Sequence, residues 1–78
     1  MLALAALGWV LSDQDRAERL LALTGLSPDA LRESLGDPSV LAAVIDFLCA
    51  HEPDLLAAAD ELGVEPQELA GTRERLAP

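Results

Sequence analysis

The chain has 78 residues, of which 51% are apolar, and its fourteen carboxylates outnumber its five arginines to give a formal net charge of −9. This length supports one domain, residues 1–78, near the lower limit for a single hydrophobic core. Such an acidic surface repels nucleic-acid phosphates and anionic membranes, so neither is expected as a partner. Leu and Ala dominate the apolar residues, and both are strong helix formers, which favours an all-α fold.

The N-terminal segment and the single cysteine bear on cellular location. Residues 1–11 are apolar and uncharged, but they lack the basic start and the clear cleavage site of a signal peptide. They are also shorter than the ~20 apolar residues that span a bilayer. Cys49 has no second cysteine to pair with, and we expect it to be a small core residue. A soluble protein of the reducing cytoplasm is therefore predicted.

Prolines and glycines divide the chain into six expected helices, over residues 2–11, 14–24, 28–35, 38–49, 52–62 and 66–75. Either Ser12 or Asp13 can cap the second helix. Four of the five prolines lie in expected first turns, and Gly25, Gly36 and Gly63 lie at expected helix ends. Because these signals agree with the apolar periodicity, the sequence predicts a compact bundle of six short helices.

The fourth expected helix is the element around which the others should pack. Residues 40–49 are apolar on every side of a 3.6-residue period except at Asp46, and a helix of that kind is buried. Asp46 is expected either on the one wet edge of this helix or in the core, bound to an arginine or a backbone donor. An unpaired buried carboxylate would be too costly.

A shift of 38 residues aligns the two halves of the chain, about residues 2–35 and 40–76. The aligned pairs include the only two aromatic residues and two Gly-apolar-x-Pro turns: Leu7 with Ile45, Trp9 with Phe47, Val10 with Leu48, Leu11 with Cys49, Gly25 to Pro28 with Gly63 to Pro66, and Leu31 with Leu69. We therefore predict two copies of one three-helix unit, each burying its first helix against the other. In this register Asp46 matches Gly8, which predicts a crowded helix crossing. Chance similarity between Leu-rich helices is the alternative explanation.

Two segments have the spacing of a helix-turn-helix corner: Leu21-x3-Gly25-Leu26-x4-Leu31 and Ala59-x3-Gly63-Val64-x4-Leu69. A small first residue lets the two helices approach, and the first segment has a large one. A DNA-reading helix would carry basic or amide side chains. The helix after the second corner has as many acids as arginines, so the corners are predicted only to fold helices back on each other.

Ser34 raises the hypothesis of a carrier protein, because acyl carrier proteins are also acidic, helical and of this length. They attach their prosthetic group to a Ser that follows Asp and precedes Leu at the start of a long helix. In this chain Glu33 precedes Ser34, and Ser34 lies near the end of a short helix, just before Gly36 and Pro38. An acidic carrier, or an acidic regulatory protein that binds basic partners, is therefore the second hypothesis.

Catalysis is not expected. His51 is the only histidine and follows the central helix, where a protonated imidazole would suit the helix dipole and cap the helix. Glu52 and Asp54 are its neighbours, but the turn between them prevents joint metal coordination. The sequence shows no Cys–His pair, Ser–His–Asp set or Gly-rich phosphate loop. No enzyme activity, cofactor, metal or small-molecule substrate is predicted.

The first expected helix gives the one positive indication of function. Residues 1–12 carry no charge, and their apolar side chains cover more than one helix face. A domain of this size buries only about 60–65% of its chain surface, so part of that area stays available to a partner. The predicted partner surface comprises Leu2, Leu4, Leu7, Trp9 and Leu11. The leading hypothesis is a non-catalytic interaction module that forms a homo-oligomer or docks on another helical protein.

Three segments carry a resemblance to a known family: residues 19–28 (RLLALTGLSP), residues 41–48 (LAAVIDFL), and the acidic turn at Glu52 followed by Gly63-Val64-x-Pro66. On these segments the chain resembles a bacterial family of short all-helical proteins, domain of unknown function 3572. The likeness covers nearly the whole chain. Family members usually have a longer lead-in before the helix at Leu2. The resemblance implies a helical fold and brings no known activity or ligand.

Overall fold

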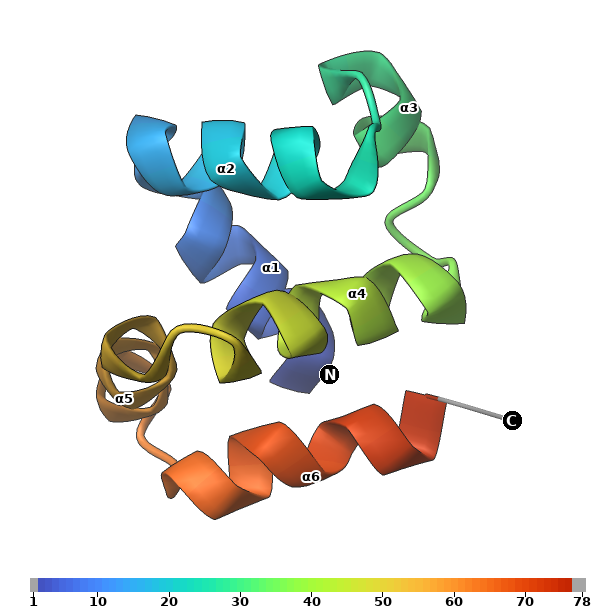
Figure 1. Cartoon of the computed structure of the whole chain (residues 1–78). Coiled ribbons are helices and arrows are strands. Elements are labelled where there is room, and N and C mark those ends of the chain that lie inside the picture. The colour runs from blue at the N-terminus through green and yellow to red at the C-terminus, as the bar shows by residue number, and fades with distance from the viewer. Residues whose placement is uncertain (1, 77–78) are drawn as a thin grey trace.

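The computed structural model describes residues 2–76, which form six helices (Figure 1): α1 (Leu2–Leu11), α2 (Gln14–Thr24), α3 (Pro28–Glu33), α4 (Pro38–Cys49), α5 (Glu52–Leu62) and α6 (Pro66–Leu76). The expected all-α bundle is confirmed. Five helices begin and end within one residue of the expected positions, and α3 ends two residues earlier than expected.

Short polar side chains start three of the helices. The Asp13 carboxylate accepts hydrogen bonds from the backbone N–H groups of Asp15 and Arg16, at 2.9 and 3.2 Å. The Ser27 hydroxyl caps α3, and the Asp37 carboxylate caps α4. Each side chain satisfies a donor that the first helical turn leaves without an intrahelical partner.

Glycine follows the last residue of two helices, α2 and α5, but it does not end α3 as expected. Gly25 and Gly63 have φ values of 74° and 72°, in the left-handed region that residues with a Cβ avoid. The prediction that Gly36 ends α3 is wrong. That helix ends at Glu33, and the Ser34 N–H donates to the Leu31 carbonyl at 3.0 Å.

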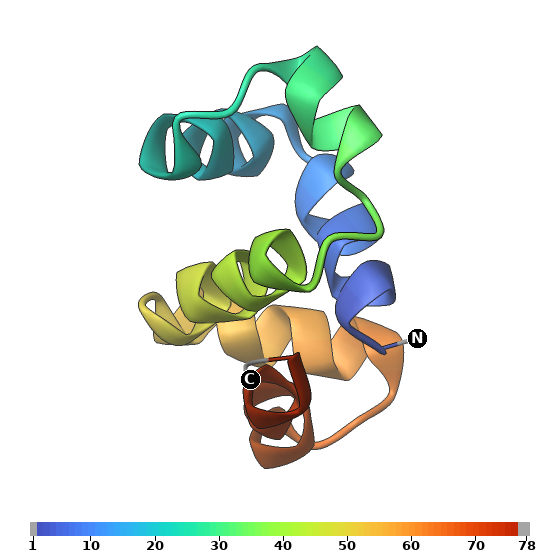
Figure 2. The same ribbon diagram turned by 90° about the vertical axis from the view of Figure 1, so that its right-hand side faces the viewer.

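The core forms where α4 packs against α1, α5 and α6, as Figures 1 and 2 show from two directions. Helix α2 covers one end of this arrangement, and α3 contributes a single buried side chain, Leu31. The largest fully buried side chains come from α1, α2, α4 and α6: Leu7, Val10, Leu20, Val44, Ile45, Leu48 and Leu69. The central position predicted for the fourth helix is confirmed.

One stripe of α4 remains exposed and carries its only charge. Asp46 lies on this stripe, and its carboxylate accepts a hydrogen bond from Nε of Arg73 on α6, at 2.9 Å. The crowded crossing predicted from Gly8 is wrong, because nothing lies within 4 Å of a Cβ added there. The prediction that Cys49 is a core residue is also wrong, since Cys49 is exposed at the end of α4.

The two halves of the chain agree in the bounds of their second helices, but not in the length of their third helices or in packing. The bounds of α2 and α5 differ by 38 residues at both ends. Members of the aligned pairs Leu7–Ile45, Val10–Leu48 and Leu31–Leu69 are all buried. In contrast, α6 packs along α4, whereas α3 makes no comparable contact with α1. Descent of the two halves from one unit stays a prediction.

Replacement by alanine is expected to change the stability of the protein in opposite directions at two glycines. Gly63→Ala is expected to destabilise the protein by about 1–2 kcal/mol, because an L residue is strained at that φ. Gly8→Ala lies inside α1 with open space around it and should stabilise by ~0.5–1 kcal/mol. Urea unfolding followed by circular dichroism measures both. Equal effects of the same sign would contradict the assigned backbone conformations.

The helix caps predict a loss of stability in acid. Hydrogen bonds from the backbone N–H groups of Arg16 and Asp15 lower the pKa of Asp13 below its usual 3.8, and the Ser39 hydroxyl and N–H do the same to the pKa of Asp37. A lowered folded-state pKa stabilises the fold above the unfolded-state value, and this stability disappears as the pH falls through the folded-state pKa. Asp13→Asn with Asp37→Asn should therefore flatten the fall in unfolding free energy between about pH 5 and 2.

Ser27→Ala is the matched control for the acid experiment, because it removes a cap that does not titrate. It should lower stability by ~0.5–2 kcal/mol at every pH. An unchanged pH profile in the double Asn variant would show that these carboxylates do not govern acid unfolding.

Candidate interaction surface

The predicted partner surface on α1 is only partly exposed. Leu4 and Leu11 are 43% and 41% exposed, and Leu2 and Trp9 are half-buried. Leu7 is 1% exposed and belongs to the core, so its assignment to a partner surface is wrong. Because α1 packs against four other helices, little of its apolar surface is free for a partner.

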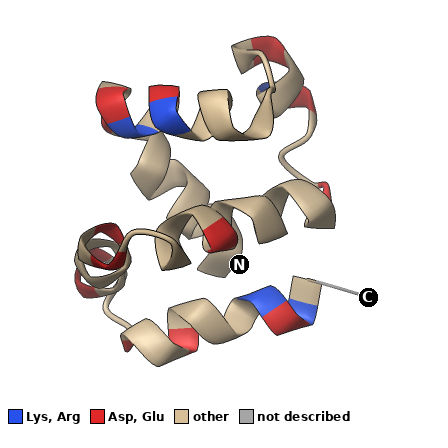
Figure 3. Ribbon diagram, in the orientation of Figure 1, with Lys and Arg blue, Asp and Glu red and all other residues tan. Residues whose placement is uncertain are grey.

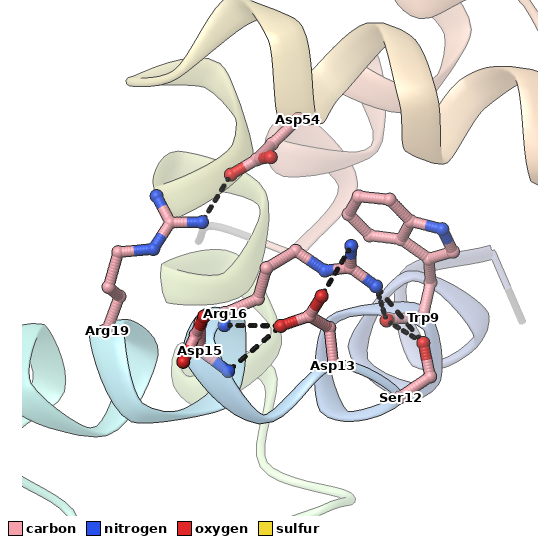
Figure 4. Close-up of polar contacts among 7 residues, drawn as sticks. All are labelled: Trp9, Ser12, Asp13, Asp15, Arg16, Arg19 and Asp54. Atoms are coloured by element: carbon pink, nitrogen blue, oxygen red, sulfur yellow. Dashed lines mark hydrogen bonds and ion pairs between the residues drawn. The ribbon is translucent and has the colours of Figure 1, made fainter.

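Arg16 from α2 covers Trp9, as the close-up in Figure 4 shows. The guanidinium carbon of Arg16 lies 3.7 Å from the centroid of the Trp9 ring, a cation–π contact. Nη2 of Arg16 donates to the Trp9 carbonyl at 2.9 Å and to the Ser12 hydroxyl at 3.1 Å. Asp13 adds an ion pair at 3.6 Å. This network fixes the corner between α1 and α2 and removes most of Trp9 from the candidate surface.

A second arginine of α2 links the two halves of the chain. Nη2 of Arg19 donates to the Asp54 carboxylate of α5 at 3.0 Å (Figure 4). Its guanidinium also lies 5.6 Å from the ring of Phe47. Both aromatic residues are therefore covered by arginines of α2, and α2 is held to the rest of the bundle by charge as well as by apolar contact.

Leu11 also lines an apolar groove, which the sequence of the first helix alone does not predict. The groove has a volume of about 350 Å³ and lies between the end of α1, α2 and α3. Its lining residues are Leu11, Gln14, Ala17, Glu18, Leu21, Pro28, Leu31, Arg32 and Leu35. Leucines form its floor and walls, while the charged side chains Glu18 and Arg32 come from α2 and α3 respectively. We call this feature the α1–α3 groove.

The two helix corners differ at one residue that explains the groove. In the second corner the small, buried Ala59 lets α6 pack closely on α5. In the first corner Leu21 holds this position, and α3 does not pack extensively on α2. The large side chain keeps the helices apart and leaves a gap lined by leucines. This Leu-for-Ala difference is the sequence signal that could have predicted the groove.

A larger groove of about 680 Å³ lies between α4 and α6, but most of its polar side chains already bind one another. The Asp37 carboxylate caps α4 through Ser39, and the Asp46–Arg73 pair crosses the groove. The only histidine, His51, does not line it. The Ser39 hydroxyl donates to the Asp37 carboxylate at 2.8 Å, so both groups already serve the start of α4.

The remaining candidate residues do not converge on a site. Ser34 is the C-cap residue of α3, not the first residue of a helix as in carrier proteins. His51 is the N-cap residue of α5 without a side-chain bond, so its predicted role at the end of α4 is wrong. Desolvation, and secondarily the Asp46 charge, raise the pKa of the Cys49 thiol, which disfavours the reactive thiolate.

Two further findings concern residues 2–76 as a whole. Within this part of the chain, His, Cys, Asp and Glu form no group of three or more that could hold a metal ion. None of the helices there combines the length and apolar character needed to cross a membrane.

Removing the guanidinium over Trp9 gives a direct optical test of the α1–α2 corner. Arg16→Ala should shift the emission of Trp9, the only tryptophan, to the red and lower stability by about 1–3 kcal/mol, because charged hydrogen bonds and the cation–π contact are lost. Arg32→Ala is the control, since its ion pair with Asp29 is 73% and 87% exposed; in dilute protein it should change stability by no more than ~0.5 kcal/mol. Identical spectra for both variants would contradict the stacked arrangement.

Comparison with known proteins identifies a family but no individual relative. No curated protein and no solved structure matches the chain. The sequence profile described as "Protein of unknown function (DUF3572)" matches residues 1–78. This match agrees with the resemblance carried by the Leu-Thr-Gly-Leu and Asp-Phe segments. The chain belongs to the DUF3572 family.

Proposed function

We propose that this protein is a non-catalytic interaction module that binds a helix of a protein partner in the α1–α3 groove. The observation that carries the proposal is the groove itself, about 350 Å³ in volume and lined mainly by leucines with a few polar groups. Helix-in-groove recognition uses apolar side chains spaced along one face of a helix, and a leucine-lined groove suits them.

The composition of the groove supports binding rather than reaction. Its titratable side chains are Glu18 and Arg32, which supply one charge of each sign but not the adjacent nucleophile and base of a covalent catalyst. Leu11 is 41% exposed beside it, and apolar surface of this kind is typical of interaction sites. The single cysteine supports a cytoplasmic location for this module.

Site-specific photo-crosslinking in the native host tests the proposal. Replacing Leu11 with the photoreactive residue p-benzoylphenylalanine places a short-range crosslinker at the groove. The same replacement at Leu56, 47% exposed on α5 and outside the groove, is the matched control. We expect an adduct of defined mass from position 11 and none of that mass from position 56.

The mass of the adduct also identifies the kind of partner. Twice the monomer mass indicates a second copy of this chain, and any other mass indicates a different protein. No adduct at position 11, or the same adduct from both positions, would contradict a binding role for the groove.

A further inference from the structure

We propose that the partner in the α1–α3 groove is a second copy of this chain, related by a two-fold axis that runs parallel to the groove. This inference rests on the proposed function and specifies its partner. Three features carry it: the charge on opposite walls of the groove, the position of Leu11, and the unequal distribution of charge between the two halves.

The walls of the groove carry opposite charges. Glu18 lies on the α2 wall and Arg32 on the α3 wall. A two-fold axis along the groove brings the α2 wall of one copy opposite the α3 wall of the other. In the proposed dimer each Glu18 pairs with the Arg32 of the second copy, and the interface forms this pair twice. A groove with two walls of the same charge would repel its own copy.

Both charged side chains are available for such a pair. Arg32 contacts Asp29 at 3.4 Å, but these two side chains are 73% and 87% exposed, and ion pairs of this kind contribute little. Glu18 accepts one hydrogen bond, at 3.3 Å from the exposed Gln14 amide. Giving up the Arg32–Asp29 and Gln14–Glu18 contacts to form charged pairs across the interface therefore costs little free energy.

Leu11 makes the surface self-complementary. It lines the groove and is also exposed at the end of α1. An interface with two-fold symmetry needs protrusion and recess on the same patch, so that each copy inserts what the other receives. The exposed Leu4, Leu23 and Leu56 do not line the groove.

The charge of the chain is distributed so that a dimer through the α1–α3 groove avoids most repulsion. Residues 2–35 carry five carboxylates and three arginines, whereas residues 36–76 carry nine carboxylates and two arginines. Figure 3 shows that the acidic positions of α5 and α6 lie on ribbons far from α3. The molecule measures 31 Å along its longest axis, several times the Debye length of ~8–10 Å in physiological salt. Contact through the less charged half therefore keeps the strongly acidic halves apart.

Charge reversal tested by analytical ultracentrifugation decides whether this dimer forms. For the full chain, the weight-average mass should rise with concentration from 8.2 kDa towards twice that value. Glu18→Arg and Arg32→Glu should each weaken association about tenfold or more, because each places like charges together twice. An equimolar mixture of these two variants should associate again, since both cross-copy pairs then unite opposite charges. The double variant should also associate.

Apolar variants provide the matched controls. Leu11→Asn should weaken association, and Leu56→Asn, equally exposed but outside the groove, should leave it unchanged. Circular dichroism of each variant at low concentration checks that the helices are intact. A wild-type chain that stays monomeric at every concentration, or single charge reversals that associate like wild type, would overturn the proposal. If the chain is monomeric while position 11 still crosslinks to a different protein, the interaction module remains and the homodimer is rejected.

Discussion

The burial of α4 against α1 and α6 is the contact on which the rest of the structure depends. Leu41, Val44, Ile45, Phe47 and Leu48 are all buried along this one helix, and each large apolar side chain removed from water contributes about 1.5–3 kcal/mol. A chain of 78 residues has few other sources of stability. The remaining helices therefore take positions that complete this one core, and α3, which buries only Leu31 and packs extensively on no other helix, is the least involved.

The limited burial of α3 has a functional consequence. A helix that contributes one core residue leaves its other apolar contacts incomplete, and the leucines around it line the α1–α3 groove. Leu21 produces this gap at the first corner, whereas Ala59 closes the second corner. Two corners with the same glycine turn thus have different outcomes: one completes the core and the other leaves an apolar groove at the surface.

Arginines add polar contacts between helices that also pack through apolar side chains. Arg16 and Arg19 cover Trp9 and Phe47, and Arg73 joins α6 to the exposed stripe of α4. With five arginines for fourteen carboxylates, most acids lack such a partner and lie in solvent, where they favour solubility. The acidic character of the chain is therefore unevenly distributed, and the groove lies in the half with less of it.

The positions and order of the helices follow from the sequence alone, because caps, prolines and left-handed glycines each act on backbone within a few residues. Asp13, Ser27 and Gly63 each act on their own turn, so their effect is readable without a fold. Which apolar residues are exposed depends instead on how the helices pack in the folded chain. Leu7 and Leu11 look equivalent in sequence, yet Leu7 is enclosed by the neighbouring helices while Leu11 borders the groove. The expected burial of Cys49 and the expected crowding at Gly8 are wrong for the same reason. Burial depends on neighbours that are distant in the chain, and the apolar pattern of a single helix does not say which neighbours these are.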